Sequence, residues 1–364
     1  MPKTLFLHIG HFKTGTTALQ AFLGDNPKFL ARHQFAYGKA NQHLSKHSIY
    51  AFSLYKAAGV TRLMHGYDKP DTPDALWTAL FDEVRASRAR SVIVSSEEFM
   101  RLGQYPQAAQ HLRQIVQTHA QDLDIRVIAY LRPPARHLRS WYNQLVKMGV
   151  TVPDFNTAVT QVIEPIHYDY ALALKPWAEI FGPGALIVRP YHEASRHDDS
   201  LYRDFLSIFG LELPDHGVKL PLIDPNPRMD DSVLELVRMM QNAGIPQDVL
   251  DWTVIRAQKF DEQQQGAGLD SPAADFDAVR AQTASGLEGL QHLIAADSTG
   301  LAQSLAAHLP EPEPQAERDI WRMTGVLLNE LHALRQRMIK ENAGIHDRIH
   351  RLEQQLGKGA KKKK

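Results

Sequence analysis

The opening of the chain places a short apolar run, a glycine-containing loop and a helical pattern directly after one another. The run at residues 4–9 (TLFLHI) is almost uninterrupted, which is typical of a strand buried on both faces of a parallel sheet. The loop GHFKTGT follows, and apolar residues then recur at helical spacing, at Ala18, Leu19, Phe22 and Leu23. A strand, a loop and a helix in this order predict an α/β fold.

The same alternation continues through the first half of the chain. Further buried-strand patterns lie at residues 91–94, 125–131 and 185–188, and helical patterns at residues 74–88, 108–119 and 201–209. Strands that alternate with helices indicate a parallel sheet flanked by helices. Ligands in such sheets bind beyond the carboxyl ends of the strands, so the loop after residue 9 is the first candidate site.

The C-terminal third has a different character and divides the chain into three predicted parts. Residues 1–260 are expected to form a catalytic domain, and residues 261–315, which end in LPEPEPQ, a weakly specified helical or linker region. Residues 316–364 predict one long amphipathic helix, whose apolar positions are Leu327, Leu331, Leu334, Met338, Ile345, Leu352 and Leu356. Glu341 and Arg348 interrupt this stripe, which either packs on its own domain or meets a second copy in a coiled-coil homodimer.

The composition of the chain limits which classes of partner it can attract. The 364 residues carry 41 basic and 41 acidic side chains, so no net field attracts nucleic acid. The chain has no cysteine and no apolar stretch near the roughly 20 residues of a membrane span, and we expect a cytoplasmic protein. Five of the last eight residues are lysines, which are either a solubilising end or a weak contact to an anionic membrane surface.

The loop after the first strand is suited to an anion. Its backbone N–H groups and the start of the following helix favour negative charge, and Lys13 adds a full positive charge. The loop residues that we expect to bind a phosphate group are Lys13, Thr14, Gly15, Thr16 and Thr17. The spacing of Gly10 and Gly15 matches the nucleotide-triphosphate loop, but Thr16 stands where that motif has lysine. No predicted strand ends in the acid that would hold magnesium, so we expect an anion site without a metal.

A second basic anchor follows the strand at residues 125–131. Arg132 stands at the strand end, Pro133 and Pro134 can open a helix, and Ser140 lies about two turns into that helix. An arginine fork together with a serine hydroxyl can bind one phosphate group. Arg136 and Arg139 on the same helix are interpreted as solvated surface, and Trp141 and Tyr142 as core residues.

Taken together, these two motifs resemble the sulfotransferases that use 3′-phosphoadenosine-5′-phosphosulfate (PAPS). KTGTT after an apolar strand resembles the 5′-phosphosulfate loop of this family, in the form found in heparan sulfate N-sulfotransferases and bacterial carbohydrate sulfotransferase-like proteins. The strand-end arginine followed by a helical serine resembles the family's 3′-phosphate motif. The resemblance covers residues 4–210. It implies a P-loop-type α/β domain that transfers a sulfuryl group from PAPS to a hydroxyl or amine of a carbohydrate or glycolipid acceptor, with Arg132 and Ser140 on the 3′-phosphate.

The catalytic base stays open among several residues. Glu97 lies just past the strand at residues 91–94 and is the first choice, with Glu98 second. Adjacent residues that leave a strand face opposite ways, so we expect only one of the two acids to point inward. The cytosolic sulfotransferases have a histidine at the end of the corresponding strand, so this chain departs from that pattern. The rivals are His43 and His47, which a helix would place on one face, with His65 further along.

Two other functions remain open at this point. A P-loop nucleotide kinase would share the strand, loop and helix, and magnesium dependence would distinguish it from a sulfotransferase. A non-catalytic PAPS-binding protein would keep Lys13, Arg132 and Ser140 and use its C-terminal helix for assembly. The residue patterns do not select the acceptor.

Overall fold

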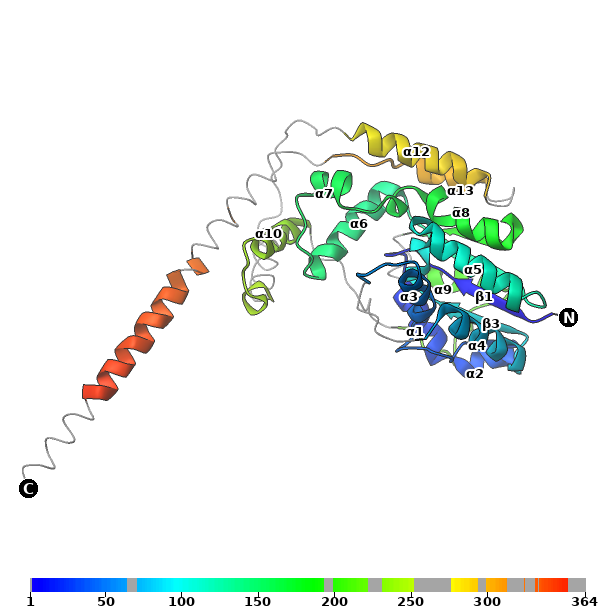
Figure 1. Cartoon of the computed structure of the whole chain (residues 1–364), viewed down its shortest axis with the longest axis horizontal. Coiled ribbons are helices and arrows are strands. Elements are labelled where there is room, and N and C mark those ends of the chain that lie inside the picture. The colour runs from blue at the N-terminus through cyan, green and yellow to red at the C-terminus, as the bar shows by residue number, and fades with distance from the viewer. Residues whose placement is uncertain are drawn as a thin grey trace, which may run out of the picture. The chain divides into compact units, whose positions relative to one another are not determined.

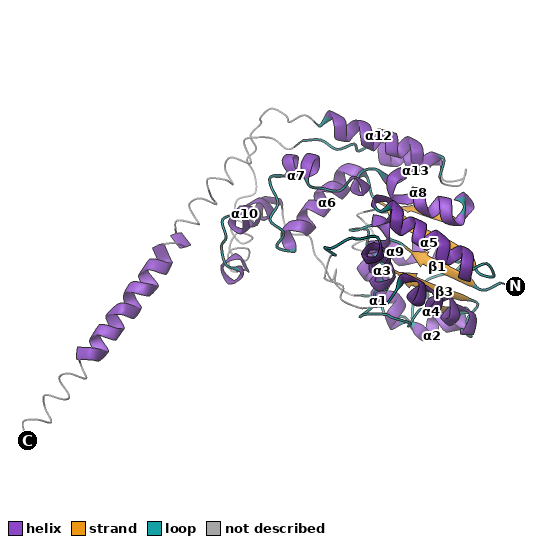
Figure 2. Ribbon diagram, viewed as in Figure 1, coloured by secondary structure: helices purple, strands orange, loops and turns teal. Residues whose placement is uncertain are grey.

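The computed structural model of the chain shows an α/β fold, as the sequence predicted, and describes residues 2–63, 71–192, 199–221, 231–251, 276–293, 299–312, 324, 331–332 and 334–352. The strands are β1 (Thr4–His8), β2 (Phe35–Tyr37), β3 (Ser91–Ser95), β4 (Asp124–Leu131) and β5 (Leu186–Pro190). They form one sheet in the order β2-β3-β1-β4-β5, and every pair is parallel. Figure 2 shows these strands in orange among the helices.

Helices connect and cover the strands. In chain order they are α1 (Thr16–Asp25), α2 (Pro27–Arg32), α3 (Ser48–Ala57), α4 (Pro73–Ala86), α5 (Pro106–His119), α6 (Pro134–Lys147), α7 (Phe155–Gln161), α8 (Tyr170–Phe181), α9 (Ser200–Ser207), α10 (Asp231–Asn242), α12 (Asp277–Gln291) and α13 (Thr299–Ala306) (Figure 1). Three short 3-10 helices are η1 (Glu97–Gln104), η2 (Pro165–His167) and η3 (Pro183–Ala185).

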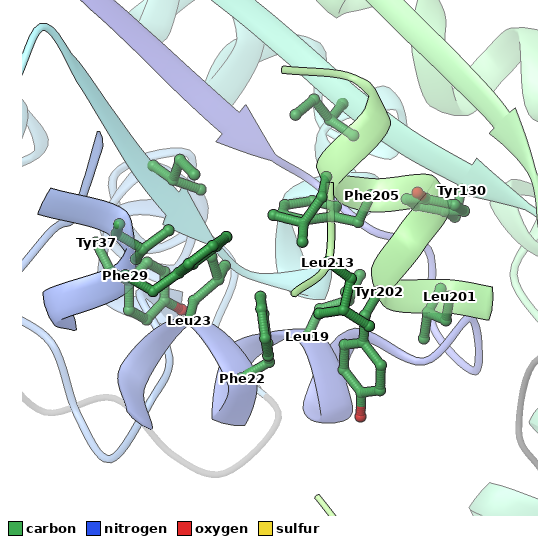
Figure 3. Close-up of a cluster of buried hydrophobic side chains, with 14 of the residues drawn as sticks. Leu19, Phe22, Leu23, Phe29, Tyr37, Tyr130, Leu201, Tyr202, Phe205 and Leu213 are labelled. Carbon is green, nitrogen blue, oxygen red and sulfur yellow. The ribbon is translucent and has the colours of Figure 1, made fainter. Parts of the chain in front are cut away.

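One face of the sheet is covered by α1, α2 and α9. Leu19, Phe22 and Leu23 of α1 pack with Tyr202 and Phe205 of α9 in a buried cluster that also takes in Ile93, Ile128 and Tyr130 from the strands (Figure 3). Side chains alternate along a strand, so Ile128 and Tyr130 face this layer while Val127 and Ala129, also buried, face the opposite one. Burial on both faces explains why residues 127–131 of β4 form an uninterrupted apolar run.

A second layer joins α3, α4, α5, α8 and the 3-10 helix η1. Its buried aromatic rings include Trp77, Phe81, Phe99 and Trp177, and the Phe99 and Trp177 rings meet edge to face with centroids 5.6 Å apart. At Gly103 of η1, a Cβ atom would lie 2.0 Å from the Leu172 carbonyl oxygen of α8. Only glycine fits there, so η1 and the residues at its start are held closely against α8.

The chain divides into two compact units. The first contains residues 1–142, 159–228 and 275–312, and therefore the whole sheet, α12 and α13. The second contains residues 143–158, 229–274 and 313–364. Within this second unit, Leu236 and Met240 of α10 pack with Ile245 and Leu250, and Arg238 donates a hydrogen bond to the Val152 carbonyl oxygen at 3.2 Å.

The C-terminal segment is helical where it is described, at residues 334–352, and every side chain in that range is exposed. Its apolar positions include Met338, Ile345 and Leu352, whose side chains are 56%, 52% and 59% exposed. The predicted long C-terminal helix is therefore present, while Leu327, Leu356 and the lysine tail lie outside the described residues. Among the described helices, none combines the length and apolar character needed to cross a bilayer.

Candidate anion-binding site

The loop between β1 and α1 has a turned backbone. Gly10, Lys13 and Gly15 all have a positive φ, at 66°, 63° and 77° respectively. Glycine adopts this left-handed conformation freely, whereas a lysine there costs about 1–2 kcal/mol. Backbone strain of this kind is retained where a side chain has to be held in one direction, and Lys13 is the residue that the sequence predicts to bind a phosphate group.

Close packing explains both glycines. A Cβ at Gly10 would lie 2.7 Å from Thr16 Oγ1 and 3.5 Å from Glu97 Cα, so the loop passes directly beside the start of η1. A Cβ at Gly15 would lie 2.5 Å from Leu201 Cδ2. Gly15 is the N-cap of α1 and provides no side-chain cap, so the helix start has N–H groups that its own cap residue does not satisfy.

The threonine hydroxyls of the loop are used internally. Thr14 Oγ1 accepts from the His11 backbone N–H at 3.1 Å and donates to the His11 carbonyl oxygen at 2.7 Å. Thr16 Oγ1 donates to the same carbonyl at 3.2 Å, and Thr17 is exposed in the first turn of α1. Thr14 and Thr16 therefore fix the shape of the loop, and either would have to give up this bond before donating its proton to a ligand.

The second anchor lies at the end of β4. Arg132 follows the strand and is 1% exposed, and its carbonyl oxygen accepts a hydrogen bond from the Tyr170 hydroxyl at 2.5 Å. Ser140 of α6 is also 1% exposed, and its Oγ has no hydrogen-bond partner among the described residues. Arg136 is exposed, while Trp141 and Tyr142 are buried, as the sequence predicted for each.

His137 connects the two anchors. It lies on α6 between Arg132 and Ser140, and its ring is 4.1 Å, centroid to centroid, from the ring of His11 in the β1–α1 loop. The pKa of His137 lies well below its usual range, because burial disfavours its charge and because His11, His167, Arg132 and Lys13 add smaller effects of the same sign. Lys13 follows β1 and Arg132 follows β4, and these two strands are paired neighbours in the sheet, so the structure brings Lys13 and Arg132 into the same region.

Glu97 begins η1 at the carboxyl end of β3 and contacts this region from the other side. Its Oε1 forms an ion pair with Lys46 Nζ, and its Oε2 accepts from Gln20 Nε2 of α1 at 3.1 Å. Burial alone would raise the pKa of Glu97, but the Lys46 ammonium, its hydrogen bond and those from the Glu97 backbone and Gln20 hold that pKa below its usual value. Glu97 is therefore a carboxylate at neutral pH.

Glu98 has the opposite protonation state. Its side chain is 2% exposed, and its Oε2 has no hydrogen-bond partner among the described residues. Burial, together with repulsion from Glu97, raises the pKa of Glu98 to about 8. The two acids differ because Lys46 pairs with Glu97, and not because consecutive strand residues alternate, since both lie in a 3-10 helix.

The histidine segment differs from the prediction. His43 and His47 do not share a helix: His43 lies in a turn bridged to Lys46, and α3 begins only at Ser48 with His47 as its N-cap. His43 is exposed, whereas His47 is buried, with Nε2 2.9 Å from the Gly38 carbonyl oxygen and Nδ1 accepting from the Ser95 N–H at 3.2 Å. Both ring nitrogens of His47 are thus engaged, and burial lowers its pKa. His65 lies outside the described residues.

Sequence reasoning missed two features of this region. Lys46 and Gln20 carried no motif, and only the fold brings them to Glu97. The second feature is a cluster of three fully buried histidines, His11, His137 and His167, each of which offers one ring nitrogen within 4.8 Å of the others. Their separation in sequence hides them from any spacing rule for metal ligands.

Comparison with known proteins adds little to this geometry. No protein-family model matches the chain. An uncharacterized protein from Archaeoglobus fulgidus is 29% identical over 169 residues, which are 45% of this chain and 42% of that protein. The chain therefore spans less than half the length of this curated relative.

One solved structure that matches the chain is a sulfotransferase from Alicyclobacillus acidocaldarius. It matches with a TM-score of 0.40 and 22% sequence identity, over 70% of this chain and 96% of that one. At this level of similarity we infer neither the fold nor the chemistry of this chain from the match.

Proposed function

We propose that this chain is a sulfotransferase that moves a sulfuryl group from PAPS to a hydroxyl or amine of a carbohydrate or glycolipid acceptor. The observation that carries the proposal is the gathering of two separate basic anchors at one place. Lys13 lies in the loop after β1 and Arg132 at the end of β4, the strand that pairs with β1. His11, two residues before Lys13, and His137, five residues after Arg132, have ring centroids 4.1 Å apart. A donor with phosphate groups at both its 5′ and 3′ positions requires two such anchors.

The two anchors offer different binding groups, and each set suits one of the two phosphate-bearing ends of the donor. The loop offers backbone N–H groups, an α1 N-terminus without a side-chain cap and one lysine, which suit the 5′-phosphosulfate. At the other end, Arg132 supplies a guanidinium and Ser140 a buried hydroxyl with no partner among the described residues, which suits a phosphate oxygen. AMP and ADP lack the 3′-phosphate that this second pair would bind.

The transfer itself is a displacement at sulfur. A lone pair of the acceptor oxygen or nitrogen forms a new bond to sulfur while the bond from sulfur to the bridging phosphate oxygen breaks. The electron pair of the broken bond stays on adenosine 3′,5′-bisphosphate, whose 5′-phosphate gains negative charge. Lys13 would stabilise that charge, and the acceptor proton passes to a general base.

Glu97 remains the proposed base, now with Lys46 beside it. Glu97 is ionised at neutral pH and can therefore accept a proton, but the ammonium that keeps it ionised also makes it a weak base. Lys46 is 34% exposed, so the sulfate or phosphate oxygens of an arriving donor can attract it away from the carboxylate. The pKa of Glu97 would then rise when the donor is in place. Glu98, His43 and His47 are the lesser candidates, since Glu98 is protonated and both nitrogens of His47 are engaged.

We also propose that the exposed C-terminal helix joins two copies of the chain. Within the described residues 334–352, the apolar side chains of Met338, Ile345 and Leu352 recur every seven residues and are more than half exposed. A heptad repeat of this kind becomes buried when two such helices pair. The lysines that follow would add attraction to an anionic surface of about 1 kcal/mol each.

The transfer reaction can be tested without knowing the acceptor. Purified full-length protein is incubated with sulfur-labelled PAPS and a panel of sugars, glycolipids and phenols, with and without magnesium. The proposal predicts label transfer to one acceptor class that survives removal of magnesium. A γ-phosphate transfer from ATP that requires magnesium, in the absence of any sulfuryl transfer, would instead identify a nucleotide kinase.

A further inference from the structure

Three histidines from distant parts of the chain meet in the interior beside the two anchors. His11 lies in the β1–α1 loop, His137 on α6 and His167 at the end of η2, and all three side chains are 0% exposed. Their ring centroids are 4.1 Å apart for His11 and His137, 5.3 Å for His137 and His167, and 5.4 Å for His11 and His167. The sequence predicted no metal in this chain, because no predicted strand ends in the acid that would hold magnesium.

Hydrogen bonds orient the rings. His11 Nε2 lies 2.9 Å from the Ile166 carbonyl oxygen, which can only accept, so this nitrogen carries the proton and Nδ1 keeps the lone pair. His11 Nδ1 is buried and has no hydrogen-bond partner among the described residues. His167 Nδ1 and His137 Nε2 form a hydrogen bond with each other at 3.0 Å, so one of these two nitrogens carries a proton. His167 Nε2 lies 3.9 Å from Glu164 Oε2, beyond hydrogen-bond distance. An ion that binds His11 Nδ1, His137 Nε2 and His167 Nδ1 therefore takes the place of the proton between the last two, and that proton moves to the other nitrogen of its own ring, His137 Nδ1 or His167 Nε2, neither of which has a hydrogen-bond partner among the described residues.

This arrangement has features of a metal site. Metal-bound histidines commonly donate their other ring N–H to a backbone carbonyl or a carboxylate, as His11 does to the Ile166 carbonyl oxygen. Two nitrogens that bind one zinc ion at about 2.0–2.1 Å in a tetrahedral site are roughly 3.3 Å apart. The 3.0 Å between His137 Nε2 and His167 Nδ1 is close to that value, and one nitrogen of each ring lies within 4.8 Å of the others.

Packing fixes the rings from outside. Trp141 stacks on His167 with centroids 4.3 Å apart and an interplanar angle of 20°, and Phe12 tilts against both rings. Tyr170 meets His11 and His137 at their edges. Side chains held in this way keep their nitrogens aimed at one point.

We propose that His11, His137 and His167 form a binding site for one divalent transition-metal ion of the zinc class. Three imidazole nitrogens suit zinc, cobalt or nickel and not the oxygen-seeking magnesium or calcium. The ion ties the β1–α1 loop to α6 and η2, and so fixes the distance between Lys13 and Arg132. It takes no part in bond making, and its presence does not depend on sulfuryl transfer.

The surrounding charge sets a limit on affinity. Lys13 and Arg132 act on His137, and Arg101 acts on His167, so three cationic residues face the site. Glu164 opposes them, but it is also paired with Arg101. A doubly charged ion is therefore held less tightly here than by three histidines in a neutral environment.

The direct test is metal content. The full-length protein is produced in medium supplemented with zinc or with cobalt, and the isolated protein is analysed by inductively coupled plasma mass spectrometry. Because the site is closed to solvent, metal acquired during folding should leave slowly, and we expect about one equivalent per chain. The cobalt form should show the visible absorption of cobalt bound by three imidazole nitrogens. Less than about a tenth of an equivalent of both metals, with no such absorption, would overturn the proposal.

Variants assign the metal to these residues. His137→Gln and His167→Gln should each lower metal affinity by more than the roughly 10–100-fold that loss of an outer-shell partner costs. The matched control is His47→Gln, because His47 is equally buried but both of its nitrogens are hydrogen-bonded within the fold. Full metal content in folded His137→Gln and His167→Gln, or its loss in His47→Gln as well, contradicts the assignment. If either triad variant does not fold, the cobalt spectrum of the wild-type protein decides alone.

Discussion

Replacing Lys46 with methionine should destabilise the protein, because the Glu97 carboxylate then loses its ion-pair partner. The Glu97 side chain is 12% exposed and Lys46 is 34% exposed. Removing one partner of a buried ion pair costs about 3–5 kcal/mol, whereas an exposed pair contributes about 0–1 kcal/mol. The pair lies between these limits, so we expect Lys46→Met to lower the free energy of unfolding by about 1–3 kcal/mol near neutral pH. Methionine keeps most of the side-chain stem, so the loss reports the charge.

The pH dependence separates this effect from lost packing. In the wild-type protein the pKa of Glu97 is depressed, so its stabilising contribution is present above the pKa of an unfolded glutamate and disappears as pH falls through the folded value. Without Lys46, burial raises the pKa of Glu97, and ionisation opposes folding at neutral pH. The difference between wild type and Lys46→Met should therefore be largest near neutral pH and shrink below about pH 4.

Chemical denaturation of a double-mutant cycle measures this directly. The cycle contains wild type, Lys46→Met, Glu97→Gln and the double variant, and the coupling between the two sites should account for most of the loss. Lys28→Met, at an exposed position of α2, is the control and should change stability by less than about 0.5 kcal/mol. A loss that is the same at neutral and acid pH, or a coupling energy near zero, would refute the reasoning.

Three further predictions follow from the same geometry. Lys13→Ala should reduce sulfuryl transfer by about 10²–10³-fold while the thermal midpoint stays close to wild type, and a loss below about threefold removes Lys13 from the mechanism. Glu98→Gln should gain stability relative to wild type as pH rises towards about 8, because over that range Glu98 is ionised in the unfolded chain and must take up a proton when the wild-type protein folds; parallel stability curves would contradict the raised pKa. Truncation after residue 315 should leave a folded monomer by light scattering, and a truncated protein that still dimerises places the interface elsewhere.

The sheet was predictable because its central strands are buried on both faces. Such strands are continuous apolar runs, and the runs at residues 4–9 and 125–131 became β1 and β4 with one residue or less of error at each end. The strand β2 was not predicted, because three residues at a sheet edge are too few to show a periodic pattern. Helix α8 was also not predicted, because Pro176 interrupts its helical pattern and because its packing against η1 depends on tertiary contacts.

The site was predictable only where local sequence determines it. Lys13 and Arg132 follow strands at the carboxyl edge of the sheet, so topology alone brings them together. The state of Glu97 was not predictable, since it depends on Lys46, which lies 51 residues away in a turn. The spacing of four would place His43 and His47 on one face of a helix, but the two residues belong to a turn and a helix start. The histidine cluster required the fold itself, because its members come from three elements.

The central claim is that Arg132 and Ser140 bind a 3′-phosphate, and calorimetry with two nucleotides tests it most directly. Wild-type protein should bind adenosine 3′,5′-bisphosphate more tightly than AMP. Arg132→Ala should weaken binding of the bisphosphate by about 10–100-fold, the equivalent of one charged hydrogen bond, and binding of AMP by less than about threefold. Arg136→Ala, exposed on the same helix, should change neither by more than about threefold. Equal losses for both nucleotides in Arg132→Ala, or equal affinities in the wild type, would contradict the proposed site.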